Sequence, residues 1–388
     1  MNKHSALLLL SLLLTPVFEG CNPQSPPAKS TPPSTAAEVS PQTPQAPRSE
    51  APKSVPEAKK PTTNTGSEPP NSSNTGRESP QRAVQSSSGL PNAVLKPFPV
   101  AVHGVFLTHD AFMKRTDAYW QGLKKRGVNA LVVNVKDDSG YVYIDAKTRN
   151  QVQHVETLGF YTIARMVAFK DPTACKAHPN WVFLRSRNWL DPANPQVQQY
   201  DLGIARRAAT LGVDEVQWDY VRYPDARISY SRSHRPQTIS RFLATSRSQL
   251  HEKHVRVSAD IFGLVTTASD DMGIGQLWES VSPSVDVLSP MVYPSHYGRG
   301  HYGLKSPVHA PYALIRGALK DAERRNNLLH KKGIATASIR PWLQDFDYKA
   351  SYGRREIRAQ IEACKAMGIS SYLFWNASNS YTPDVSLR

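Results

Sequence analysis

The stretch DEVQWDYVRYPD, residues 214–225, sets an acid inside a strand. Val216, Trp218 and Val221 are typical of a buried strand, yet Asp219 stands among them and an Arg-Tyr-Pro turn follows at once. A carboxylate at the end of a buried strand loses its hydration and must recover it from partners, unless it serves chemistry. The segments on either side of this stretch therefore decide what Asp219 does.

Short apolar runs alternate with stretches of helical periodicity on both sides of it. We expect eight strands, over residues 100–108, 129–136, 159–169, 213–223, 255–263, 286–294, 333–343 and 370–378. The intervening periodicity predicts helices, among them residues 112–126, 196–211, 238–254, 312–332 and 354–367. Near-continuous apolar strands separated by helices are typical of a parallel sheet covered on both faces. Because no Gly-rich nucleotide-binding turn follows a strand, we predict the α/β class and a single closed (β/α)8 barrel of the TIM type.

The N-terminus has the pattern of an export signal. Lys3 and His4 precede an apolar run, residues 6–14, that is too short to span a bilayer comfortably. The sequence Phe-Glu-Gly-Cys that ends at Cys21 resembles the bacterial lipobox, although its Glu departs from the usual pattern. We therefore expect residues 1–21 to be a lipoprotein signal peptide, with Cys21 as the lipidated residue. The alternative is an ordinary signal peptide in which Cys21 is incidental.

A Pro-rich segment follows the signal. Residues 22–90 contain no Phe, Tyr, Trp, Ile or Met, and 17 of the 31 prolines of the chain lie between residues 22 and 99. Such a segment buries too little apolar surface to offset its chain entropy. We predict a disordered linker over residues 22–94 and a folded domain over residues 95–388. The protein is then exported and held at a membrane, facing the periplasm or the cell exterior.

The formal net charge of the chain is +15 at pH 7. A basic surface favours anionic partners, but no nucleic-acid-binding module is present, so we expect no nucleic-acid partner and solvated basic helix faces.

Cys175 and Cys364 would pair only if the fold brings them together, which the sequence leaves open. No Cys/His spacing predicts a zinc site. We expect a monomer without metal or cofactor.

Polar residues gather at the predicted carboxyl ends of the strands, where the active sites of such barrels lie. Glu215, Gln217 and Asp219 share one face of the fourth strand, and Asp260 holds the equivalent place on the fifth. Neighbouring strands are about 4.8 Å apart, so the two aspartates are expected about 5–6 Å apart, as in retaining glycosidases. Asp219 would be the nucleophile and Asp260 the general acid/base. The alternative is structural pairing of each aspartate with an arginine, for example Asp219 with Arg165 or Arg222.

Aromatic rings near the same strand ends predict sugar binding, because flat rings stack on the apolar faces of sugars. Trp218 and Tyr220 alternate with Asp219 and are instead expected to pack against helices. The residues expected to bind substrate are Asp137, Arg165, Tyr223, Tyr293, His296, Trp342, Trp375 and Asn376.

Seven sequence blocks occur in order and together resemble a bacterial family of glycoside hydrolase domains that is distantly related to the α-amylase-like barrels. The blocks are VHGVFLTHDAF, NALVVNVKDDSG, DEVQWDYVRYP, SADIFG, LSPMVYPSHY, RPWLQDF and FWNASN. The resemblance covers about residues 100–380 and implies a (β/α)8 fold with carbohydrate-directed hydrolysis. It places Asp219 at the position of the nucleophile. Asp260 matches the acid of the fifth strand, which in the amylases is usually Glu.

These features lead to one functional hypothesis and two alternatives. We expect a surface-tethered glycoside hydrolase that cleaves a bacterial or environmental polysaccharide by a two-carboxylate retaining mechanism. One alternative is a non-catalytic barrel that binds cell-envelope glycans with the same aromatic cleft. The other is a polysaccharide deacetylase, suggested by His109 and Asp110 at the end of the first strand.

Overall fold

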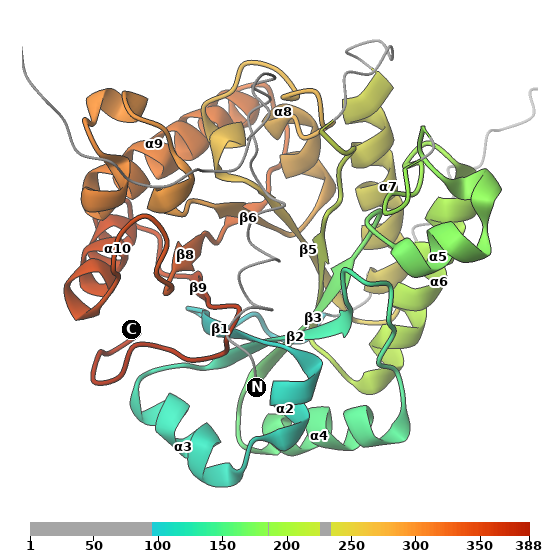
Figure 1. Ribbon diagram of the computed structural model, residues 1–388, viewed down its shortest axis with the longest axis horizontal. Coiled ribbons are helices and arrows are strands. Elements are labelled where there is room, and N and C mark those ends of the chain that lie inside the picture. The colour runs from blue at the N-terminus through green and yellow to red at the C-terminus, as the bar shows by residue number, and fades with distance from the viewer. Residues whose placement is uncertain (1–94, 185, 226–233) are drawn as a thin grey trace, which may run out of the picture. The chain divides into compact units, whose positions relative to one another are not determined.

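The computed structural model describes residues 95–184, 186–225 and 234–388. The expected signal peptide and linker, residues 1–94, lie outside the described part. Within it, parallel strands form a closed barrel, because β5 pairs with both β4 and β6, and β1 pairs with both β2 and β9 (Figure 1). The strands are β1 (His103–Leu107), β2 (Ala130–Lys136), β3 (Tyr161–Val167), β4 (Glu215–Asp219), β5 (Arg256–Phe262), β6 (Val287–Met291), β7 (Ser338–Ile339), β8 (Trp342–Gln344) and β9 (Tyr372–Trp375).

Helices surround this barrel, as Figure 1 shows, and the predicted (β/α)8 architecture is confirmed. Helix α6 illustrates how the sequence sets an element: Asn194 caps the first turn, Pro195 begins it, and Gly212 ends the following turn with a φ of 94°. The helices are α2 (His109–Lys114), α3 (Asp117–Lys125), α4 (Ala146–Thr157), α5 (Pro172–Ala177), α6 (Pro195–Ala208), α7 (His234–His251), α8 (Trp278–Val281), α9 (Pro311–His330) and α10 (Arg354–Ala366).

Among the predicted strands, the seventh differs most from the strand that the structure contains. It is expected as one run over residues 333–343, but the structure has two short strands, β7 and β8, on either side of Arg340 and Pro341. Pro341 has no N–H to give to a neighbouring strand, so the ladder is interrupted there. Both pieces pair with β6, and β8 also pairs with β9. Together they fill one position of the barrel.

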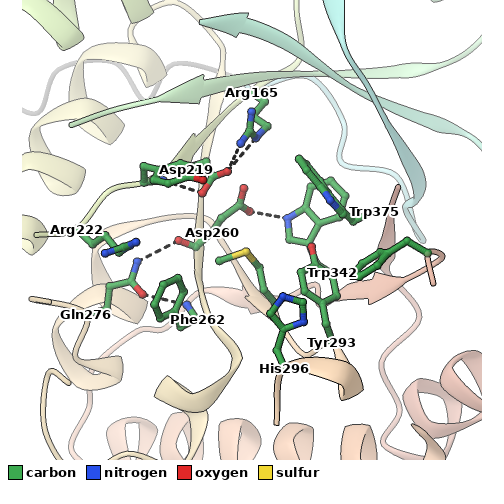
Figure 2. A pocket seen from close by; sticks show the side chains of 13 residues that line it. Arg165, Asp219, Arg222, Asp260, Phe262, Gln276, Tyr293, His296, Trp342 and Trp375 are labelled. Carbon is green, nitrogen blue, oxygen red and sulfur yellow. Dashed lines mark hydrogen bonds and ion pairs between the residues drawn. The ribbon is translucent and has the colours of Figure 1, made fainter. Parts of the chain in front are cut away.

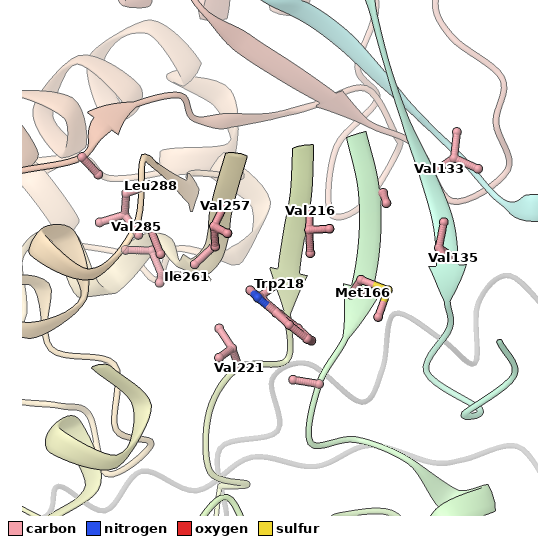
Figure 3. Packing of buried hydrophobic residues seen from close by; sticks show 14 of the residues in the cluster. Val133, Val135, Met166, Val216, Trp218, Val221, Val257, Ile261, Val285 and Leu288 are labelled. Atoms are coloured by element: carbon pink, nitrogen blue, oxygen red, sulfur yellow. The ribbon is translucent and has the colours of Figure 1, made fainter. Parts of the chain in front are cut away.

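The main apolar core lies between the barrel and its helices. On β4, Val216 and Trp218 face outward into this layer, and Figure 3 shows them beside Val257 of β5 and Met166 of β3. The indole N–H of Trp218 donates to the Ser246 hydroxyl of α7 at 2.8 Å, which satisfies its one polar atom. The prediction that Trp218 packs against a helix is confirmed.

The inside of the barrel is divided into an apolar and a polar half. Phe106, Val132, Ile163 and Leu373 form the apolar half, together with Tyr161, Tyr293 and Trp342. The polar half follows β4, where alternate residues face inward as the period of a strand requires. Gln217 donates to the Ser289 hydroxyl at 3.3 Å across this space. The predicted polar file is therefore present.

The deepest layer of that file is closed by an ion pair. Glu215 and Arg340 contact each other through both carboxylate oxygens, and the two side chains are 0% and 1% exposed. Tyr161 donates its hydroxyl to Glu215 at 3.0 Å, and Ser258 donates to the other oxygen. A buried carboxylate is held in this way by a cation and two hydroxyls, as its lost hydration demands.

Candidate active site

A pocket opens at the carboxyl ends of the strands, where barrels of this type carry their chemistry. It encloses about 560 Å³ of space, part of it open to solvent. A second hollow of about 410 Å³ shares four of its lining residues, so the two are neighbours. Figure 2 shows the pocket, which is lined by Arg165, Asp219, Tyr220, Arg222, Asp260, Phe262, Gln276, Met291, Tyr293, His296, Trp342, Phe346 and Trp375.

Asp219 stands at the last position of β4 and is held by an ion pair. One of its oxygens accepts from the Nε of Arg165 at 2.9 Å and from a second guanidinium nitrogen, and the other accepts from the Tyr220 backbone N–H at 2.6 Å. Burial by itself would lower the pKa of Arg165, but the Asp219 charge outweighs it and raises that pKa. The Asp219–Arg165 pair is the one that the structural alternative named, and it still leaves the Asp219 carboxylate facing the pocket.

Asp260 lies next to Asp219, on the neighbouring strand β5. The register pairs Trp218 with Ala259, one residue before each acid. Asp260 is 2% exposed. Its carboxyl group accepts a hydrogen bond from the Trp342 indole N–H at 2.7 Å. Burial, and after it the charge of Asp219, raise the pKa of Asp260 well above its usual value.

The two acids are therefore in different states. Asp219 is a carboxylate paired with a guanidinium, whereas Asp260 makes no ion pair with any residue of the described ranges, and its raised pKa favours the protonated form. Paired carboxyl groups whose environments separate their protonation in this way can divide the roles of nucleophile and acid. The site can deliver a charge to one face of a bond and a proton to a leaving oxygen.

Aromatic side chains form one wall of the pocket. Trp342 and Trp375 meet edge to face, with ring centroids 5.7 Å apart, and Trp375 stacks on Phe106 at 4.0 Å. Tyr293 packs edge-on against Phe346 at 5.5 Å. Such a wall offers flat apolar surfaces to a sugar ring, with polar edges left for its hydroxyls.

His296 contributes a neutral imidazole to the same wall. Burial, and after it the positive charge of Lys349, lower the pKa of His296 to about 4. Its Nδ1 lies 3.0 Å from the Ser295 hydroxyl. At neutral pH the ring is therefore uncharged, and it can both accept and donate hydrogen bonds.

A family model described as "Putative glycosyl hydrolase domain" matches residues 104–381. The chain belongs to this family. The match spans the whole barrel, so the resemblance inferred from the sequence is confirmed, and with it the glycoside hydrolase class. No curated protein sequence matches the chain.

This glycosyl hydrolase domain is also similar to solved structures. It is similar to the glycoside hydrolase domain of PgaB (BpsB) from Bordetella bronchiseptica, with a TM-score of 0.55 and 13% identity over 72% of this chain and 94% of that one. It also matches a hypothetical protein from Ruminiclostridium thermocellum, with a TM-score of 0.34 and 29% identity over 40% of this chain and 96% of that one. The spore cortex-lytic enzyme SleL of Bacillus cereus has a TM-score of 0.48 and 10% identity over 72% of each chain. At these identities the PgaB likeness shows the fold alone.

Seven of the predicted site residues come together in the pocket of the glycosyl hydrolase domain. They are Arg165, Asp219, Asp260, Tyr293, His296, Trp342 and Trp375. Two predicted substrate-binding residues instead order their own loops. Asp137 accepts from two backbone N–H groups and from the Tyr143 hydroxyl. Asn376 donates to the carbonyls of Asp345 and Ser380.

Tyr220 and Tyr223 exchange the places that we expected for them. Tyr220 has a φ of 49°, which breaks the alternation of the strand and brings its side chain into the pocket rather than against the helices. Tyr223 is fully buried, and its ring packs edge-on against Phe183 at 5.6 Å, away from the pocket lining. A left-handed residue directly after a strand carries no sequence signal unless it is Gly or Asn.

Sequence reasoning missed several lining residues. Phe262 follows Asp260 by two positions on β5, so the period of the strand contained the signal. Gln276 comes from a loop without periodicity, yet its amide accepts from the Phe262 N–H at 3.0 Å and donates to the Asp260 carbonyl at 3.3 Å. The other residues missed are Tyr220, Arg222, Met291 and Phe346.

The remaining sequence questions concern cysteines, histidines and membranes. Cys175 and Cys364 are both buried and free. His109 stacks on Tyr143 at 4.1 Å and bonds Thr148 at 2.9 Å, outside the pocket lining. In the part of the chain that the structure describes, no three His, Cys, Asp or Glu side chains gather in a potential metal site, and no helix is long and apolar enough to cross a bilayer.

Proposed function

We propose that this protein is an exported, surface-tethered glycoside hydrolase that cleaves a polysaccharide by a two-carboxylate retaining mechanism. Asp219 is the nucleophile and Asp260 is the general acid/base. The observation that carries the proposal is the pair itself: on adjacent strand ends in one pocket lie an Asp219 carboxylate paired with Arg165 and an Asp260 whose raised pKa favours its protonated form. Retaining glycosidases need these two states at the same time.

The chemistry runs in two balanced steps. The Asp219 carboxylate attacks the anomeric carbon, while the Asp260 carboxyl gives its proton to the departing glycosidic oxygen. A glycosyl ester to Asp219 forms, and the part of the polysaccharide beyond the broken bond leaves as an alcohol. Asp260, now a carboxylate, takes a proton from a water molecule whose oxygen attacks the same carbon. The ester bond to Asp219 breaks, and both acids return to their starting states.

The neighbours of the acids support these roles. Arg165 holds Asp219 at a fixed position and faces the ring of Trp375 at 5.2 Å from its centroid. The Trp342 N–H fixes the orientation of Asp260. Tyr293, His296 and Trp375 would bind the sugar. Arg165 and the indole N–H of Trp342 are positioning groups here, since each acts through an acid.

The experiment compares matched variants of the full chain on a panel of bacterial exopolysaccharides and α-glucans, with products identified by mass. Asp219→Asn should lower turnover by about 10³-fold or more. Asp260→Asn should keep partial activity on substrates with good leaving groups, because those groups need no protonation to depart. Azide should rescue the activity of this variant. Asp110→Asn is the control, since Asp110 is an exposed acid paired with Lys114.

The same panel separates the enzyme from a glycan-binding barrel. The Asp219–Arg165 ion pair would also be present in a barrel that binds without cleaving. Glycan binding with no turnover by the wild-type protein would favour that alternative. Full activity of Asp219→Asn would end its assignment as nucleophile.

Export and anchoring rest on residues 1–21 and on the Pro-rich segment after them, outside the described residues. The apolar run followed by Cys21 supports a lipid anchor, and residues 22–94 would be a spacer that lets a monomeric domain reach its polysaccharide. Wild-type protein should partition with membranes, and Cys21→Ser should be released or left unprocessed. Equal partitioning of both would contradict the anchor.

A further inference from the structure

Arg222 is a buried cation in the pocket that the proposed reaction does not use. It follows β4 by three residues, its side chain is 3% exposed, and it lines the same cavity as the two acids. In Figure 2, Arg222 and Gln276 lie on one side of Asp219 and Asp260, and Trp342 and Trp375 lie on the other. A sugar held against the tryptophans would therefore carry its far substituents toward Arg222.

Aromatic rings fix the guanidinium of Arg222. Its central carbon lies 4.7 Å from the ring centroid of Trp189, 4.6 Å from that of Phe262 and 5.8 Å from that of Tyr220. One terminal nitrogen donates to the Tyr223 carbonyl at 2.9 Å. These contacts hold the planar group without neutralising it, as cation–π packing does.

Its charge is poorly balanced by the protein. Within the described ranges, the carboxylate that pairs with Arg222 is that of Asp225, at 3.6 Å, and the side chain of Asp225 is 61% exposed. Within the pocket, the Asp219 carboxylate is already bound by Arg165. Burial lowers the pKa of Arg222, as expected of a cation that has lost water without gaining a close anion.

The lining residues that the structure describes then carry about one positive charge in total. Arg165 and Asp219 pair with each other, and the raised pKa of Asp260 favours its neutral form, so the charge of Arg222 is left without a carboxylate among the described lining residues. A buried cation whose partner carboxylate is exposed and 3.6 Å away keeps much of its desolvation cost, and an anion supplied by a ligand offsets that cost. A cationic amino sugar would raise the cost, and a neutral sugar would leave it unchanged.

We propose that the pocket selects a carboxylate-bearing sugar, a uronic acid residue, and that Arg222 binds its carboxylate. A planar guanidinium matches a carboxylate through two parallel N–H···O bonds, which a spherical ammonium does not provide. This inference rests on the proposed function, since it names the substrate class of the same site. It makes Arg222 the residue that determines specificity, while Asp219 and Asp260 carry the reaction.

Binding, measured without turnover, tests this inference. Asp260→Asn is the suitable trap because its neutral amide matches the protonated form that the raised pKa of Asp260 favours, and so preserves the charge of the pocket. Calorimetry would compare oligomers of polygalacturonate, alginate and glucuronan with their methyl esters, which keep the shape and lose the charge. We expect at least one acid form to bind about 10- to 100-fold more tightly than its ester.

Two further substitutions in the trap background complete the design. Arg222→Gln should abolish the preference for the acid form and leave ester binding unchanged, whereas Arg222→Lys should restore only part of it. Arg316→Gln removes an equal charge from an exposed position on α9 and should change nothing. Thermal unfolding of each variant checks that the fold is intact.

The outcomes separate the inference from the proposed function. The inference is overturned if no acid form binds more tightly than its ester, if Arg222→Gln behaves like Arg316→Gln, or if dextran sulfate binds as tightly as the uronates, which would mean charge alone. If wild-type protein binds uronates through Arg222 but hydrolyses nothing, the proposed function fails and the inference stands. If the wild-type protein cleaves neutral or amino glycans and Arg222→Gln cleaves them equally well, the proposed function stands and the inference fails.

Discussion

Glu215 and Asp219 are acids on the same face of the same strand, and they differ in almost everything else. Glu215, deep in the barrel, is 0% exposed, contacts Arg340 through both oxygens and accepts from Tyr161 and Ser258. Asp219, four residues further along the strand, is also bound by an arginine but is 8% exposed and faces the pocket. The lower layer is closed and the upper one is open.

The difference teaches that burial and an arginine partner do not by themselves identify an active site. Both acids have these features. What distinguishes the upper layer is access to solvent and a second carboxyl group, Asp260, that has no cation of its own in the described residues. The lower layer is therefore expected to hold the barrel together, and the upper layer to react.

Among these substitutions, Glu215→Gln should have the largest effect, which is a loss of unfolding free energy. It leaves the Arg340 charge buried without an anion, which costs about 3–5 kcal/mol of unfolding free energy. Urea denaturation measures this loss, and the hydrolytic rate per folded molecule should not change. Adding Arg340→Met should recover much of the stability. If the denaturation midpoint of Glu215→Gln equals that of the wild type, the expectation that the lower layer stabilises the barrel is wrong.

The upper layer should reveal itself through pH. Because the folded-state pKa of Asp260 is raised above an unfolded value of about 3.9, the folded protein binds this proton more tightly. The associated stability is fully present below about pH 4 and is lost as the pH rises through the folded-state pKa. Asp260→Asn has no such loss, so its melting temperature relative to wild type should climb between pH 4 and pH 8. A constant difference across that range would show that Asp260 is an ordinary ionised carboxylate.

The smallest effect is expected at His296, in the wall of the open layer. Its pKa of about 4 keeps the ring neutral, so hydrolysis should show no histidine titration between about pH 5.5 and 8. His296→Gln keeps a neutral hydrogen-bonding group and should raise KM about fivefold, the value of about one hydrogen bond, with little change in kcat. An NMR titration of His296 with a midpoint near 6.5 would contradict this.

The layers also explain which parts of the molecule the sequence revealed. Outward positions such as Val216 and Trp218 alternate with inward acids, and burial constrains the residue types at both sets of positions. The alternation therefore predicts the strand and its two faces. Asp219 and Asp260 stood out because a charge is unusual in such strands. Pro341 marks the interruption of the seventh strand, because a residue without an N–H cannot continue the ladder.

The open layer was harder to predict because loops and single backbone angles shape it. Tyr220 enters the pocket through one left-handed residue, and Gln276 arrives from a loop with no periodicity. From the sequence, Arg222 is expected only as a partner for Asp219, because charge balance within a cavity depends on which neighbour each acid has already bound. That choice is made by packing, and a linear sequence does not display it.

The pairing of β1 with β9 has a consequence for how the chain folds. At this seam Val102 donates its N–H to Ser371, 269 residues away, and the Tyr381 hydroxyl donates to the Phe106 carbonyl. Closing so long a loop is entropically expensive, and contacts of this span slow folding. Until Tyr372–Trp375 has been synthesised, β1 retains an unpaired edge that can recruit other chains. Each molecule therefore passes through a vulnerable interval that ends only when its final strand arrives.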